Sequence, residues 1–225
     1  RHKLIHLLLL PRQRRMKRSI SATKINSLFI GVALIAASFC STSCTQYNRL
    51  VEESEKVDEA WANVQNQYQR RFDLIPNLVE TVKGYATHER TTLENVTAMR
   101  TGLTDAYDKA KQFEGADMTS EENFQKYNQA QNDLKKAASI YINAVHEAYP
   151  DLKANETFKA LQAQLEGTEN RIATARKDYT QTVKSYNINV RRFPASIWAG
   201  IFGFDKKPQF AADEEAQHAQ KVSFN

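Results

Sequence analysis

The chain has 225 residues and a net charge of +5, from 31 Lys and Arg against 26 Asp and Glu, with seven Gly, five Pro and two Cys. Eight basic and no acidic residues precede Cys44, so the part from Cys44 onward carries a net charge of −3, which argues against nucleic acid as a partner. Both cysteines, Cys40 and Cys44, lie in this leader region, which excludes a disulfide, a cysteine metal site or a cysteine nucleophile in the domain that follows.

The first elements in chain order are a leader and an apolar segment. Residues 1–15 are predicted to be an over-translated or disordered leader, because Met16 is the first plausible initiator. Residues 16–43 begin with basic residues and continue with an apolar run, and small residues then stand immediately before Cys44. This is the layout of a secretory signal. Because a cysteine follows the small residues, the segment resembles a lipoprotein signal, in which the Cys44 thiol is the lipid attachment site.

An uncleaved membrane anchor is the alternative for the same segment. A transmembrane helix needs about 20 mostly apolar residues, whereas the run that ends at Cys40 holds roughly 13 to 16, which favours a signal peptide. Basic residues flank the run on its N-terminal side, and such residues stay in the cytoplasm. Both interpretations predict a chain attached to a bacterial membrane, with its domain on the extracytoplasmic side.

Residues 44–194 show the apolar spacing of three and four that is typical of α-helices, and they lack the alternation of strands. The apolar stripes run from Tyr47 to Tyr68, Leu78 to Leu103, Phe124 to Val145 and Phe158 to Tyr186. Such regular repetition is the pattern of helices that pack at shallow angles. The sequence therefore predicts an all-α domain, an antiparallel four-helix bundle of long helices, behind the N-terminal apolar segment.

The helix boundaries are predicted from capping and helix-breaking residues. Asp73 and Pro76 favour a helix start before the second stripe, because proline is tolerated in a first turn; a kink within one longer helix is the alternative. The other boundaries are predicted at Thr119 or Ser120, at Asp151 or Asn155, and at Pro194. Residues 195–210 are predicted to pack on the bundle as a short apolar segment, with contact to lipid or a partner as the alternative, and residues 211–225 to form a mobile polar tail.

Two polar groups are candidate site residues. Glu89 lies in the second stripe, and a buried carboxylate needs a partner. A buried polar network of Glu89 with Arg100 or Arg171 is therefore predicted, with a solvated Glu89 at the bundle edge as the alternative. Arg70 and Arg71 form a candidate patch for an anion or a protein partner. The competing interpretation is structural, in which one arginine pairs with a carboxylate across the helix turn and donates to exposed carbonyl groups.

Familiar catalytic motifs are missing from the sequence. It contains no glycine-rich phosphate loop, no H-E-x-x-H helix and no G-x-S-x-G turn. Glu215 and His218 form a single E-x-x-H motif, whereas a di-metal bundle needs two such motifs and further carboxylates. The sequence therefore predicts no enzymatic activity, no cofactor and no metal. An acid–base pair of Glu89 with a histidine is the enzymatic alternative.

Several runs of residues together resemble the LemA family. The longest is Gln69–Val79, QRRFDLIPNLV, and it is accompanied by Ala60–Val64, Val82–Ala86, Glu169–Ile172 and Tyr186-Asn187. The resemblance extends roughly from Tyr47 to Phe210. It implies a membrane-associated, antiparallel four-helix bundle behind an N-terminal apolar segment, and it implies no established biochemical function.

We therefore predict a membrane-anchored, non-enzymatic helical-bundle protein that acts through protein partners in the cell envelope, attached by its N-terminal anchor or by acylated Cys44. The alternative prediction is a module that binds lipid or an envelope polymer through the segment Trp198–Phe204 and through Arg70 and Arg71. Neither prediction assigns a catalytic residue to the chain.

Overall fold

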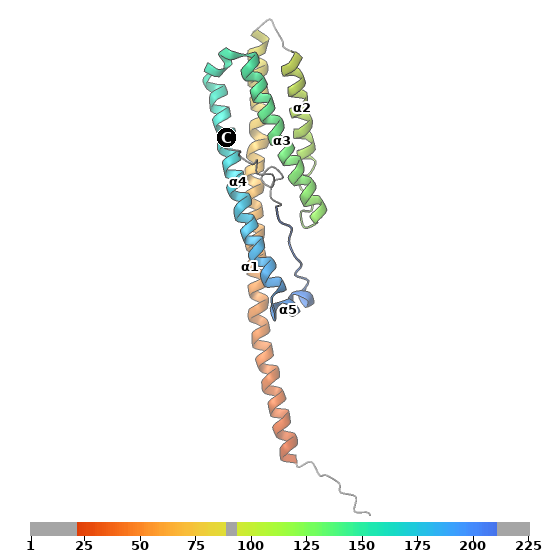
Figure 1. Ribbon diagram of the computed structural model, residues 1–225. Coiled ribbons are helices and arrows are strands. Elements are labelled where there is room, and N and C mark those ends of the chain that lie inside the picture. The colour runs from red at the N-terminus through yellow and green to blue at the C-terminus, as the bar shows by residue number, and fades with distance from the viewer. Residues whose placement is uncertain (1–21, 89–93, 211–225) are drawn as a thin grey trace, which may run out of the picture. The chain divides into compact units, whose positions relative to one another are not determined.

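Every element that the structure describes is helical. The structure is a computed structural model that describes residues 22–88 and 94–210. The elements are α1 (Ala22–His88), α2 (Glu94–Lys111), α3 (Glu121–Ala148), the 3-10 helix η1 (Pro150–Ala154), α4 (Glu156–Arg191) and α5 (Ala195–Phe202) (Figure 1). The chain divides into two units, Arg1–Thr45 and Gln46–Asn225, and both hydrophobic cores belong to the second. The predicted all-α class is confirmed.

The first long helix continues through Pro76, so the predicted helix start at Asp73 and Pro76 is wrong. A proline inside a helix costs about 3 kcal/mol, because it removes a hydrogen bond and crowds the preceding turn. Leu74, Ile75 and Leu78, which flank the proline, are all buried in the core. Burying one such side chain contributes roughly 1.5–3 kcal/mol, so the three together outweigh the penalty.

The second predicted stripe is consequently divided between two helices. Leu78 and Val82 lie on α1, whereas Val96 and Leu103 lie on α2. Residues 89–93, between the two helices, lie outside the described residues. The apolar spacing predicted which of these side chains are buried, but it did not locate the interruption.

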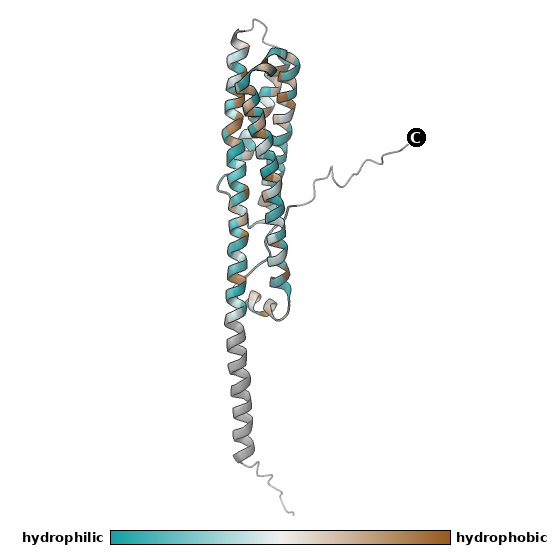
Figure 2. Ribbon diagram, turned by 90° about the vertical axis from the view of Figure 1, so that its left-hand side faces the viewer, coloured by the Kyte–Doolittle hydropathy of each residue, from teal (hydrophilic) through white to brown (hydrophobic). Residues whose placement is uncertain are grey.

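Two core clusters hold the helices together. One joins α1, α2, α3, η1 and α4, with Leu78, Leu103 and Leu134 among its fully buried members. The other joins α1, α3, α4 and α5 around Phe124 and Tyr179. Figure 2 shows the apolar positions (brown) recurring along these helices among hydrophilic ones (teal). This is the amphipathic pattern that the sequence spacing predicted.

The predicted boundaries of α3 and α4 are confirmed. Ser120 occupies the N-cap position of α3, although its side chain makes no capping hydrogen bond. Asn155 caps α4, because its Oδ1 accepts a hydrogen bond from the backbone N–H of Phe158 at 3.0 Å. α4 ends at Arg191, shortly before Pro194. Gly203, with φ of 73°, then ends α5 in the left-handed conformation that glycine tolerates, and the chain turns back.

Residues 205–210, called here the C-terminal strap, are held against α4. Asn187 donates from Nδ2 to the carbonyl oxygen of Lys207 at 2.9 Å and accepts from the Lys207 N–H at 3.0 Å. The Tyr179 hydroxyl donates to the carbonyl of Pro208 at 3.1 Å. The ring of Phe210 packs 4.9 Å from that of Phe124. The strap therefore completes the second core cluster.

Replacing Asn187 with alanine is expected to release the strap. Both backbone groups of Lys207 would lose their partner, and each unmet buried polar group costs about 1–3 kcal/mol. Amide hydrogen exchange of residues 205–210 should accelerate by about 10-fold or more, because 1.4 kcal/mol corresponds to a factor of ten. Exchange measured by mass spectrometry checks this, with the exposed Asn170→Ala on the same helix as the control. Unchanged exchange in the Asn187 variant would contradict the assignment.

Candidate functional site

The most extensive buried polar contact of the described residues is centred on Arg71. Arg71 lies on α1 and is 2% exposed, and its side chain reaches α3 and α4. Its Nε and Nη2 atoms each donate to one carboxylate oxygen of Glu169 on α4, both at 2.6 Å. Its Nη1 donates to the side-chain oxygen of Gln131 at 2.9 Å and to the Gln131 backbone carbonyl at 3.0 Å. Arg71 therefore connects three helices through a two-pronged ion pair and two further hydrogen bonds.

The structure separates the two arginines that the sequence grouped as an anion or partner patch. Arg71 is buried and already paired, so its charge is not available to an external anion. Arg70 is exposed and donates from Nη2 to Gln164 on α4 at 3.0 Å. Consecutive helical residues point about 100° apart, which is why neighbours in sequence differ in this way. The structural interpretation holds for Arg71, although its carboxylate partner comes from another helix rather than from the next turn.

The other predicted site residues are not brought together by described contacts. Arg100 on α2 is half-buried, and Arg171 on α4 is exposed. Glu89 lies outside the described residues, so the network that was predicted for the three stays a prediction. The same holds for lipid attachment at Cys44, whose side chain is not described, and for the Glu215–His218 motif.

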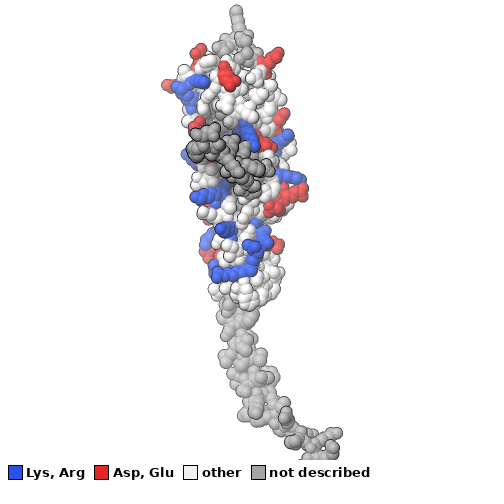
Figure 3. Space-filling view, in the orientation of Figure 1, with Lys and Arg blue, Asp and Glu red and all other residues white. Residues whose placement is uncertain are grey.

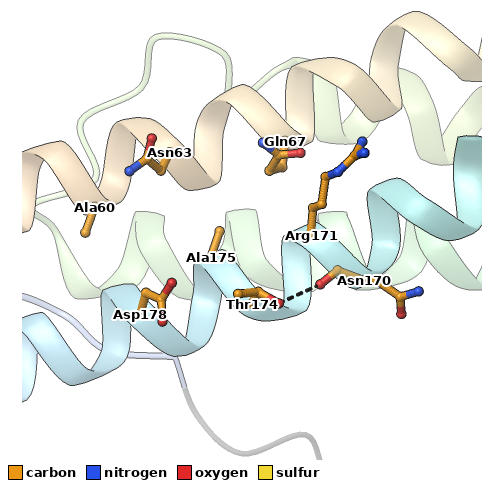
Figure 4. A pocket seen from close by; sticks show the side chains of 8 residues that line it. All are labelled: Ala60, Asn63, Gln67, Asn170, Arg171, Thr174, Ala175 and Asp178. Carbon is orange, nitrogen blue, oxygen red and sulfur yellow. Dashed lines mark hydrogen bonds between the residues drawn. The ribbon is translucent and has the colours of Figure 1, made fainter.

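A shallow groove between α1 and α4 is a candidate site that the sequence did not predict. Its volume is about 390 Å³ (Figure 4). The lining residues are small or polar: Ala60, Asn63, Gln67, Asn170, Arg171, Thr174, Ala175 and Asp178. The small side chains of Ala60 and Ala175 keep the groove open, while three amide side chains supply hydrogen-bond donors and acceptors at its walls. The Thr174 hydroxyl is already used, since it donates to the Asn170 carbonyl at 3.0 Å.

The charges of the groove lie at separate positions along α4. Arg171 and Asp178 are seven residues apart, which corresponds to about 10.5 Å along a helix axis. Figure 4 shows the two side chains at opposite ends of the drawn site. A positive and a negative group at this separation can recognise two opposite charges on one extended or helical ligand.

The groove is lined by amide, charged and small side chains. Its lining contains no histidine, cysteine or tyrosine, and its single hydroxyl faces its own helix. Across the described residues, no group of three or more His, Cys, Asp or Glu side chains is arranged to hold a metal ion. Nor does any helix in those residues contain a stretch long and apolar enough to cross a lipid bilayer.

Comparison with known proteins identifies relatives of the whole domain. The model of the LemA family matches residues 60–224. Magnetosome proteins MamQ 1 and MamQ 2 of Paramagnetospirillum magneticum are each 24% identical over 205 residues, which cover 86% of this chain and 75% of the relative. Magnetosome protein MamQ of Magnetospirillum gryphiswaldense is 22% identical over 194 residues, 81% of this chain and 71% of the relative.

Proposed function

The chain belongs to the LemA family, and we propose that it is a membrane-anchored, non-enzymatic helical protein that holds a protein partner in the groove between α1 and α4. The leader supports attachment to a bacterial membrane by a signal or anchor segment that ends at Cys44, with the domain on the extracytoplasmic side. The cores shared by the long helices support the predicted antiparallel four-helix bundle. The relatives are named for a cellular structure rather than for a reaction, which supports a non-enzymatic role.

The groove is the observation that carries the proposal. Its amide groups and small residues suit a polar protein segment, and its two charges specify the chemistry of that segment. The partner would present an acidic side chain to Arg171 and a basic one to Asp178, about two helical turns apart. Such charge complementarity selects the partner and sets its orientation more than it adds affinity.

Site-specific photocrosslinking in native membranes tests the proposal. A photoreactive residue at Asn63 or Thr174 lies in the groove, whereas one at the exposed Ser139 on α3 is the matched control. We expect the same protein partner to be captured at both groove positions and not at Ser139. Exchanging the charges with Arg171→Glu and Asp178→Lys should lower the yield about five-fold or more, since rim charges are worth around 1 kcal/mol.

Two results would overturn the proposal. One is equal capture of the same proteins at Ser139 and in the groove, which would indicate nonspecific proximity. The other is turnover of a substrate by the purified full chain, with activity lost in the groove variants. The second result would assign the groove to catalysis.

A further inference from the structure

Exposed apolar side chains of the second unit gather around α5. Seven large apolar residues are exposed among the described residues: Tyr47, Ile140, Ile188, Phe193, Ile197, Ile201 and Phe202. Four of them lie in the short stretch 193–202, and Tyr47 contacts that stretch directly. Phe193 is 78% exposed and Ile201 is 63% exposed. Scattered single residues of this kind need no explanation, but a contiguous group indicates a binding surface.

Three of these exposed residues lie on α5, and Phe193 precedes the helix by two residues. Ala195 and Ala199 are the buried residues of α5, and Ala199 belongs to the second core cluster, so the helix docks with small side chains. Ile197 and Ile201 are one helical turn apart on the exposed side. Burying a side chain of this size contributes roughly 1.5–3 kcal/mol. We call the exposed surface formed by Phe193, Ile197, Ile201 and Phe202 the α5 face. Burying these side chains against a partner or a membrane would add favourable free energy that the fold itself does not gain.

The α5 face contacts Tyr47, and Tyr47 lies close along the chain to Cys44, the predicted attachment point. The Tyr47 ring packs 4.8 Å from the Phe202 ring and 5.8 Å from the Phe204 ring. Tyr47 follows Cys44 by three residues, and consecutive Cα atoms are 3.8 Å apart, so connectivity alone keeps their Cα atoms within about 11 Å. If the protein is attached to the membrane through Cys44, the α5 face stays close enough to contact the lipid headgroups.

Basic residues border the α5 face. Arg191 and Arg192 precede it and Lys206 follows it, all exposed, against the single carboxylate of Asp205 in the same flanking segments. Figure 3 shows Lys and Arg side chains (blue) bordering the uncharged white surface at the lower end of the described residues. An apolar face edged by Lys and Arg, on a helix that also carries Trp198, is the composition of a segment that lies in a membrane interface.

We propose that α5 is an interfacial membrane helix, which inserts the α5 face among the headgroups of an anionic bilayer. This inference rests on the membrane attachment in the proposed function and adds a second contact with the same bilayer. An apolar surface edged by basic residues adds its own affinity for an anionic bilayer to that of the anchor. Two contacts also fix the orientation of the domain, and therefore the direction in which the α1–α4 groove faces.

Tryptophan fluorescence of the full chain in vesicles tests the inference. The chain has two tryptophans. Trp198 lies on α5, and Trp61 on α1 packs against the second core cluster beside Phe124 and Tyr179, at centroid distances of 5.4 and 5.3 Å. The difference between the full chain and its Trp198→Phe variant isolates the emission of Trp198. We expect lipids brominated near the headgroup to quench Trp198 strongly and Trp61 weakly, and more so in vesicles with anionic lipid.

Matched variants separate the apolar and the basic contributions. Ile197→Ser with Ile201→Ser should reduce the quenching of Trp198 at least about three-fold, whereas Ile140→Ser, which removes an exposed isoleucine on α3, should leave it unchanged. Arg191→Gln with Arg192→Gln should abolish most of the dependence on anionic lipid, since each basic residue near such a surface changes binding by about five-fold.

The outcomes distinguish this inference from the function on which it rests. A chain that floats with vesicles while Trp198 stays unquenched in both lipid compositions is attached, but its α5 face is not in the bilayer; the inference is then wrong and the proposed attachment stands. Capture of a protein at α5 under those conditions would make the face a protein contact instead. A chain that does not float overturns the attachment and this inference together.

Discussion

Replacing Arg71 with alanine should lower the free energy of unfolding by about 3–5 kcal/mol, the usual effect of removing one partner of a buried ion pair. The substitution leaves the Glu169 carboxylate without its two short hydrogen bonds from Arg71, and the buried Gln131 side-chain oxygen without its donor. It also leaves a cavity between three helices. Urea unfolding of the full chain, followed by far-ultraviolet circular dichroism, measures the change.

The adjacent arginine supplies the matched control for this experiment. Arg70→Ala removes an exposed side chain with one described hydrogen bond, to Gln164, and should change the free energy of unfolding by about 0.5 kcal/mol at most. The double variant Arg71→Met with Glu169→Leu leaves no unpaired charge. Its loss of unfolding free energy should therefore be about 1–3 kcal/mol smaller than the summed losses of Arg71→Met and Glu169→Leu alone. Equal losses for Arg70→Ala and Arg71→Ala would contradict the buried pair.

The apolar spacing in the sequence is sufficient to predict that Arg71 is buried. Val64, Tyr68, Ile75 and Leu78 continue one apolar stripe along α1, and Arg71 occupies the position between Tyr68 and Ile75 in the same register. The predicted stripe ends at Tyr68, before the helix start predicted at Asp73 and Pro76. A helix continued through the proline would have placed Arg71 among buried residues and Arg70 outside them. Around Pro76, apolar packing outweighs the preference of proline for a first helical turn.

The groove and the α5 face were less accessible to sequence reasoning. The groove depends on how α1 and α4 are rotated towards each other, and its polar residues are ordinary for helix surfaces, so no spacing distinguishes them. For α5, composition predicted a short apolar segment but not its orientation. Only the structure shows that Ala195 and Ala199 take the buried side, which leaves the larger Ile197 and Ile201 outside.

Stability should fall steeply as the pH rises from about 10 to 12, because several tyrosines are buried. The pKa of Tyr127 is raised to about 12, mainly by burial and to a smaller extent by the neighbouring Tyr68, while Gln131 and Arg71 oppose the shift. Burial likewise raises the pKa of Tyr141 to about 12. The pKa of Tyr179 is also raised by burial, with a smaller contribution from the carboxylate of Asp58. In the unfolded chain all three titrate near 10.

The sign of the effect follows from which state loses protons first. Between pH 10 and 12 the unfolded chain has lost these protons while the folded protein retains them, so rising pH favours unfolding. The stabilising contribution is complete below about pH 10 and disappears as the pH approaches the folded-state values. Each tyrosine contributes a slope of up to about 1.4 kcal/mol per pH unit, so Tyr127 and Tyr141 should each remove about 2–3 kcal/mol by pH 12.

Urea unfolding at a series of pH values measures this loss, and tyrosinate absorbance reports when the hydroxyls titrate. Tyr141→Phe removes one titrating group from the core, so its stability should fall less steeply between pH 10 and 12 than that of the unmodified chain, by up to about 1.4 kcal/mol per pH unit. Tyr47→Phe is the matched control, since the Tyr47 side chain is 39% exposed. Parallel pH profiles for the unmodified chain and Tyr141→Phe would show that other groups cause the alkaline unfolding. A shallower profile for Tyr141→Phe alone would assign part of the loss to this buried hydroxyl.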